Sequence, residues 1–136
     1  MLRILIIEDA PVNQEFLLLA LKPHGECLAV STGEAGLAEH GRALAEGRPF
    51  DLVFLDIMLP GIDGLKTLEL LRAAEDSGEV PQSRRVHVIV TTVLDDDKTA
   101  SRAFIQGNAL SYMTKPFRVR EITDELQNLG LLQAGE

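Results

Sequence analysis

The sequence lacks the features that mark secreted, membrane-bound or nucleic-acid-binding proteins. Cys27 is the single cysteine among 136 residues, so no disulfide can form within the chain. Lys and Arg number 13 against 21 Asp and Glu, and the net charge of −8 argues against nucleic acid, whose binding surfaces are basic. No apolar run has the length of a membrane span, and no leader precedes the first apolar segment. We therefore expect a cytoplasmic protein with neither a membrane nor a nucleic-acid partner.

Length and composition bound the architecture. Hydrophobic residues make up 46% of the chain, which is enough to build a core, and 136 residues suit one domain. There is no internal repeat, no low-complexity tract and no linker-like composition. We expect a single domain over residues 1–136, with its core at about 2–129.

Short apolar segments alternate with segments of helical periodicity. The expected strands are residues 2–7, 26–31, 50–56, 86–92 and 109–114. The expected helices are residues 11–21, 32–46, 65–75, 95–106 and 119–129. Such alternation predicts an α/β fold, with a parallel sheet covered by helices on both faces. Ligands of these folds bind beyond the carboxyl ends of the strands, where the strand order reverses.

Charged side chains stand at the carboxyl ends of several expected strands. Glu8 and Asp9 follow the first strand, Asp56 ends the third, and Lys115 follows the fifth. Three neighbouring carboxylates repel one another, and Mg²⁺ relieves such repulsion through oxygen ligands. No His or Cys cluster is present, which disfavours zinc. A carboxylate nucleophile, a metal and an ammonium group together are suited to phosphoryl transfer through an aspartyl phosphate.

Each acidic residue has a simpler interpretation when it is taken alone. Asp9 precedes Pro11 at the start of an expected helix, where a carboxylate often serves only as the N-cap. Asp56 stands before a loop and allows the same interpretation. The joint occurrence of these groups at several strand ends is what favours a functional site.

Four blocks of sequence resemble a known family. The segments ILIIED, FLDIMLPGIDG, VIVTT and YMTKPF are similar to the signature blocks of bacterial two-component response-regulator receiver domains, including single-domain chemotaxis regulators. The resemblance extends over about residues 2–129. It implies a flavodoxin-like, doubly wound sheet of five parallel strands in the order 2-1-3-4-5, with five helices.

The resemblance also implies roles for individual residues. Asp56 matches the phosphoacceptor, and Lys115 matches the lysine that pairs with the phosphate. Glu8 and Asp9 match the acidic pair that binds Mg²⁺, Asp9 directly and Glu8 through water. Met58 matches the position whose backbone carbonyl completes the metal site. The implied cofactor is Mg²⁺.

Two further positions match the family's conformational switch. Tyr112 matches the switch aromatic residue of the fifth strand, and a hydroxyl is expected at the end of the fourth. Thr91 and Thr92 both stand there, and alternation along a strand lets only one of them face the site. Spacing from Lys115 favours Thr92. The resemblance also implies a cis peptide bond before Pro116.

We expect a stand-alone receiver domain that accepts a phosphoryl group from a sensor histidine kinase or a histidine phosphotransfer protein. Its output would be contact with a downstream protein, through the surface formed by the fourth helix, fifth strand and fifth helix. It would not be a turnover enzyme. A phosphatase of the haloacid dehalogenase type is disfavoured, because it needs a second Asp where Met58 stands. A flavin carrier is disfavoured as well, because the loop after its first strand is rich in Ser, Thr and Gly, and the loop here is not. The remaining alternatives are a fragment of a longer regulator and a non-phosphorylated scaffold of the same fold.

Two segments are longer than the family pattern. These are residues 41–48 and residues 73–85, both far from the expected site. Each would either lengthen a helix or form a partner surface.

Overall fold

A computed structural model describes residues 1–93 and 111–132 of the chain. Five parallel strands form one sheet in the order β2-β1-β3-β4-β5, which confirms the predicted doubly wound topology. The strands are β1 Leu2–Ile7, β2 Gly25–Val30, β3 Leu52–Asp56, β4 His87–Val93 and β5 Ser111–Lys115. The helices within the described ranges are α1 Pro11–Leu21, α2 Gly33–Ala45, α3 Gly64–Ser77 and α5 Val119–Asn128, with short 3₁₀ turns η1 Lys22–His24 and η2 Gln82–Arg84.

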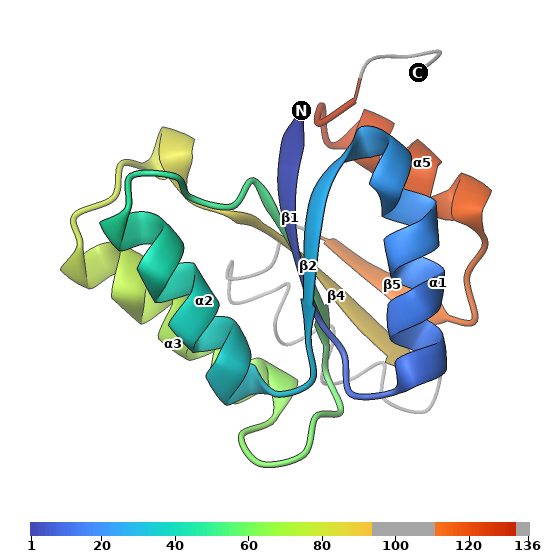
Figure 1. Cartoon of the computed structure of the whole chain (residues 1–136), viewed down its shortest axis with the longest axis horizontal. Helices are drawn as coiled ribbons and strands as arrows, with labels where there is room; N and C mark the ends of the chain where they lie inside the picture. The colour runs from blue at the N-terminus through green and yellow to red at the C-terminus, as the bar shows by residue number, and fades with distance from the viewer. Residues whose placement is uncertain (94–110, 133–136) are drawn as a thin grey trace.

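The helices cover the sheet on both faces (Figure 1), with α2 and α3 on one face and α1 and α5 on the other. Strand β1 shows why the sequence requires this arrangement. Leu5 and Ile7 pack into the core beneath α2 and α3, whereas Ile4 and Ile6 pack beneath α1 and α5. All four side chains are fully buried, as expected for a continuous apolar strand in the middle of a parallel sheet.

Local sequence sets where the helices begin. Pro11 occupies the first turn of α1, where its missing N–H costs nothing. Thr32 caps α2 by accepting a hydrogen bond from the Ala35 N–H at 3.1 Å. Asp63 caps α3 in the same way, through the Lys66 N–H at 2.8 Å. None of the described helices is long and apolar enough to cross a membrane.

Most expected boundaries hold within two residues. The predicted third strand begins at Leu52 rather than at Phe50, and the predicted fifth strand extends to Lys115. The predicted fourth helix, residues 95–106, lies outside the described residues, as do the first two residues of the predicted fifth strand.

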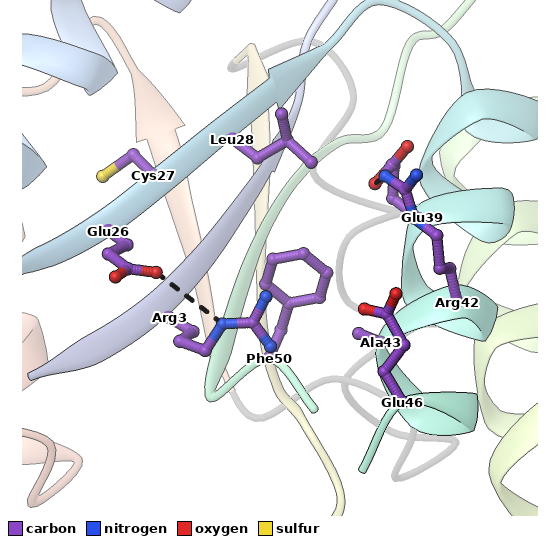
Figure 2. Close-up of a pocket in the computed structure, with 9 residues that line it drawn as sticks. All are labelled: Arg3, Glu26, Cys27, Leu28, Glu39, Arg42, Ala43, Glu46 and Phe50. Carbon is purple, nitrogen blue, oxygen red and sulfur yellow. Dashed lines mark hydrogen bonds and ion pairs between the residues drawn. The ribbon is translucent and has the colours of Figure 1, made fainter. Parts of the chain in front are cut away.

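The segment 41–48 lengthens α2, which runs to Ala45. The end of α2 lies beside the amino-terminal parts of β1 and β2, and a hollow of about 200 Å³ lies between them (Figure 2). The Arg3 guanidinium lies there, 4.9 Å from the centre of the Phe50 ring, with Nε 3.9 Å from Glu26. This hollow is at the opposite end of the sheet from Asp56.

The segment 73–85 lengthens α3 and is anchored to β4. Glu75 is buried and accepts hydrogen bonds from the Arg72 guanidinium and the Val86 N–H, both at 2.8 Å. His40 of α2 is also buried, with its Nε2 3.6 Å from the Glu75 carboxylate. Helix α3 therefore continues to Ser77, two residues into the segment that we expected to be a loop.

Candidate functional site

The carboxylates singled out in the sequence meet at the carboxyl edge of the sheet. Glu8 and Asp9 directly follow β1, Asp56 ends β3, and these two strands pair in parallel. One carboxylate oxygen from each residue lies within 4.8 Å of the others. Glu8 and Asp56 are buried, whereas Asp9 is exposed. The edge therefore carries a cluster of three carboxylates, two of them buried and one open to solvent.

Lys115, the last residue of β5, lies at the same edge of the sheet and contacts two of these carboxylates. Its Nζ lies 2.6 Å from Glu8 Oε1 and 3.3 Å from Asp56 Oδ2. Only 18% of the Lys115 side chain is exposed, so water screens these contacts weakly. The Lys115–Pro116 peptide bond is cis, as the resemblance implies.

The two buried carboxyl groups are held differently. Burial raises the pKa of Asp56 to about 6. Two contacts act in the opposite direction and lower this pKa: the charge of Lys115, and the Met58 N–H, which donates to Asp56 Oδ1 at 2.9 Å. Burial also opposes ionisation of Glu8, but hydrogen bonds from Lys115 and from the Ala10 N–H outweigh it and lower the pKa of Glu8. One ammonium group thus serves two buried carboxylates, and Glu8 receives the shorter bond.

This donor set fits Mg²⁺. The cluster consists of carboxylate oxygens alone, and hard divalent cations prefer oxygen ligands. Glu8, Asp9 and Asp56 would hold the ion, with the backbone carbonyl of Met58 as a further oxygen. The exposed position of Asp9 leaves room for the waters that Mg²⁺ retains.

Gly64 holds the loop after β3 against the end of that strand. The Gly64 N–H donates to the Ile57 carbonyl at 3.1 Å. A Cβ at Gly64 would lie 2.3 Å from the Asp56 carbonyl oxygen and 2.5 Å from the Ile57 Cα. Real Cβ atoms do not approach backbone so closely, so any side chain here would displace the backbone that carries the Asp56 carboxylate.

Thr91 and Thr92 are both buried at the end of β4. Thr91 is the register partner of Asp56, so their side chains leave the same face of the sheet. Thr92 pairs with Thr114 and lies one residue nearer the carboxyl edge. Register therefore brings Thr91 beside Asp56, and the choice of Thr92 as the switch hydroxyl stays a prediction.

Tyr112 and Met58 lie at the margins of the site. Tyr112 stands on the edge strand β5, three residues before Lys115, and 38% of it is exposed. The Met58 side chain points to solvent with 63% exposed, and its backbone N–H contacts Asp56. Their expected roles in switching and metal binding stay predictions.

A hollow of about 480 Å³ lies next to the carboxylates. Its lining is largely apolar and includes two charged residues, Glu8 and Lys115. The other lining residues are Val12, Asn13, Phe16, Leu17, Pro116 and Phe117. The Phe16 and Phe117 rings meet edge to face at 6.0 Å, and Val12 is 80% exposed. This surface of α1 and the segment after β5 adjoins the Lys115 ammonium.

Gln14 contacts the site but does not stand out in the sequence. Its side-chain amide donates to the Glu8 carbonyl at 2.6 Å, to the Val30 carbonyl at 3.1 Å and to Ser31 Oγ at 3.2 Å. A polar residue in the first turns of a helix is ordinary, and the Ser31 contact depends on the end of β2. No signal in the sequence alone could have identified it.

Fold and site together define a doubly wound α/β domain with a cation-binding acidic cluster where the strand order reverses. The sequence pattern of the response regulator receiver domain matches residues 4–127, and the chain belongs to this family. Among curated relatives, it is 33% identical over 129 residues to the probable C4-dicarboxylate response regulator DctR of Bacillus subtilis, covering 92% of this chain. It is 34% identical over 129 residues to the transcriptional regulatory protein TcrA of Mycobacterium tuberculosis, covering 94% of this chain.

The chain spans about half the length of these curated relatives, 50% of DctR and 46% of TcrA. Solved structures are similar over almost the full chain. The receiver domain of sensor histidine kinase PA1611 from Pseudomonas aeruginosa, which has a magnesium ion coordinated in its active-site cleft, is 28% identical with a TM-score of 0.74, over 93% of this chain and 95% of its own. A putative response regulator from Chloroflexus aurantiacus is 26% identical with a TM-score of 0.77, over 96% and 98%.

Proposed function

We propose that this receiver domain accepts a phosphoryl group on Asp56 from the phosphohistidine of a sensor histidine kinase or a histidine phosphotransfer protein. The observation that carries the proposal is the Asp56 carboxylate, held between the Met58 N–H and the Lys115 ammonium beside Glu8. The proposed output is contact with a downstream protein, and the proposed location is the cytoplasm.

The chemistry follows from the contacts of Asp56. One carboxylate oxygen attacks phosphorus in line with the phosphorus–nitrogen bond of the donor, and that bond breaks. The electron pair of the broken phosphorus–nitrogen bond stays on the imidazole nitrogen of the donor, and this nitrogen takes a proton. Lys115, already 3.3 Å from Asp56 Oδ2, pairs with a phosphoryl oxygen. Bound Mg²⁺ supplies further positive charge to the phosphoryl oxygens.

The hollow beside Lys115 supports approach of a protein donor. It is lined by apolar side chains of α1 and of the segment after β5, and it reaches Glu8 and Lys115. An apolar surface next to a charged site is typical of a protein contact. We propose that the histidine-bearing element of the donor docks here, which would present its phosphoryl group to Asp56.

Phosphorylation would then act as a local change of charge. In the proposed switch, Thr92 moves toward the phosphate and Tyr112 moves inward from its half-exposed position. The downstream partner would read the surface of the fourth helix, β5 and α5. Of this surface, β5 and α5 lie within the described residues, and Val119 of α5 is 48% exposed.

A second arrangement has support from the relatives. DctR and TcrA are about twice as long as the matched region, so this receiver would equally serve as the input part of a longer regulator. The acceptor chemistry is the same in both arrangements. In neither is the domain a turnover enzyme on an external substrate.

The test is incubation with acetyl phosphate and Mg²⁺, followed by intact-mass measurement of wild type and Asp56→Asn. We expect the mass of one phosphate on the wild type alone, and none when Mg²⁺ is chelated. Labelling of Asp56→Asn to the same extent would refute the assignment of the acceptor.

A further inference from the structure

The amide of Gln14 ties three segments together at the edge of the acidic cluster. It belongs to the first turns of α1, yet it donates to the Glu8 carbonyl at the end of β1 and to the Val30 carbonyl at the end of β2. It also lies 3.2 Å from the Ser31 hydroxyl. The contact with Glu8 is the shortest of the three, at 2.6 Å.

The chemistry of the partners fixes which end of the amide faces them. A carbonyl oxygen can only accept a hydrogen bond, so the NH₂ group of Gln14, rather than its oxygen, must point at Glu8 and Val30. The two amide hydrogens are shared among these two carbonyls and Ser31 Oγ. An apolar side chain of the same length would leave both without the donor.

The Glu8 carbonyl belongs to the peptide group that joins Glu8 to Asp9. This short segment is restrained from several sides: the Glu8 N–H donates to Val30 at 3.0 Å, and the Ala10 N–H donates to the Glu8 carboxylate at 3.1 Å. Asp9 itself is exposed, and its carboxylate makes no hydrogen bond or ion pair with the residues that the structure describes. The hydrogen bonds of the flanking backbone therefore fix the point from which the Asp9 side chain extends.

We infer that Gln14 is a positioning residue that orients the Glu8–Asp9 peptide, and through it the Asp9 carboxylate, for Mg²⁺ beside Asp56. It acts through backbone and touches neither the metal nor the phosphoryl group. Groups that orient metal ligands in this way typically contribute about 10- to 100-fold to metal affinity. The inference rests on the proposed Mg²⁺-dependent phosphorylation of Asp56.

The test separates metal affinity from the rate of phosphoryl transfer. Gln14→Met keeps the length and removes the donor, and Gln14→Asn keeps an amide that is one methylene too short. Mg²⁺ affinity of the full chain is measured by titration calorimetry, and labelling by acetyl phosphate is followed as a function of Mg²⁺ concentration. For Gln14→Met we expect about 10-fold weaker Mg²⁺ binding and an equal rise in the half-saturating Mg²⁺ concentration. The maximal rate at saturating Mg²⁺ should stay within about twofold.

Ser31→Ala is the matched control, because it removes the third contact of the same amide and leaves the Glu8 contact in place. It should bind Mg²⁺ like wild type. Circular dichroism identifies the variants that fold. If Gln14→Met does not fold, Gln14→Asn is used for the same measurements. Wild-type Mg²⁺ affinity in a folded Gln14 variant overturns the inference, as does a lower maximal rate with unchanged half-saturation. Failure of wild type to be labelled overturns the proposed function instead.

Discussion

The Lys115 ammonium lies 2.6 Å from the Glu8 carboxylate, although 107 residues separate them in the chain. The same nitrogen is 3.3 Å from Asp56. Lys115, the last residue of the edge strand β5, thus links that edge to the centre of the sheet, and its single positive charge faces two buried carboxylates. Its removal should therefore affect stability as well as phosphorylation.

Lys115→Met keeps the aliphatic chain and removes the charge. Without Mg²⁺ we expect the free energy of unfolding to fall by about 2 kcal/mol, because Glu8 and Asp56 lose a charged donor. Mg²⁺ should restore more stability to Lys115→Met than it adds to wild type, since the cation neutralises the same carboxylates. Urea unfolding with and without Mg²⁺ measures both effects.

Lys66→Met is the control for this change. Lys66 is exposed and lies 3.8 Å from Glu69 on the surface of α3, where an ion pair contributes little. Its unfolding should be close to wild type with and without Mg²⁺. An equal loss in both variants would mean that the Lys115 contacts add nothing specific.

Gly64→Ala tests the close packing behind Asp56. A Cβ there would lie 2.3 Å from the Asp56 carbonyl oxygen, so the backbone must move and we expect a loss of at least about 2 kcal/mol in unfolding free energy. Labelling of Asp56 should also slow. Gly41→Ala, inside α2 with nothing within 4 Å of its Cβ, should instead be stabilising by about 0.5–1 kcal/mol. If Gly64→Ala and Gly41→Ala change the free energy of unfolding equally, close contact with the Asp56 backbone does not explain the loss in Gly64→Ala.

Glu75 should make stability depend on pH. Burial raises the pKa of Glu75, but the His40 ring 3.6 Å away and the hydrogen bonds from Arg72 and the Val86 N–H outweigh burial and lower this pKa below 4.5. A carboxyl group with a depressed pKa in the folded state contributes its full stability above the unfolded pKa, and the contribution is lost as pH falls through the folded value. We therefore expect Glu75→Gln to be less stable than wild type at pH 7, by about 2 kcal/mol.

This difference between wild type and Glu75→Gln should shrink as the pH falls below about 4.5, the value for an unperturbed Glu. Urea unfolding from pH 7 down to about pH 3.5 would follow it. Glu69→Gln, on the exposed surface of the same helix, serves as the comparison. A constant difference across this range would show that the Glu75 carboxylate is not selectively stabilised in the folded protein.

The sheet could be predicted because its determinants are local. The unbroken apolar run from Ile4 to Ile7 predicts a strand buried on both faces, and both cores use it. The capping roles of Thr32 and Asp63 likewise depend on neighbouring residues alone. The meeting of Glu8, Asp9 and Asp56 follows from the parallel topology, since strand ends share one edge.

Features that depend on distant partners could not be predicted. The end of α3 is held by Glu75 through the Val86 N–H and by the buried His40, contacts that cross from helix to strand and from helix to helix. Gly78 and Pro81 lie nearby and favour a loop, so composition misplaces the boundary. The role of Gln14 depends in the same way on where β2 ends.

The hydroxyl that serves the phosphate is the point at which register and spacing favour different residues. Register pairs Thr91 with Asp56, whereas spacing from Lys115 favours Thr92, which lies one residue nearer the edge where a phosphoryl group would stand. We expect Thr92→Val to slow labelling by acetyl phosphate about 100-fold, the lower end of the effect of losing one donor to a developing charge. Thr91→Val, the same change of hydroxyl to methyl one residue earlier, should label at close to the wild-type rate. Time courses by intact mass at saturating Mg²⁺ distinguish them, and the reverse order would assign the hydroxyl to Thr91.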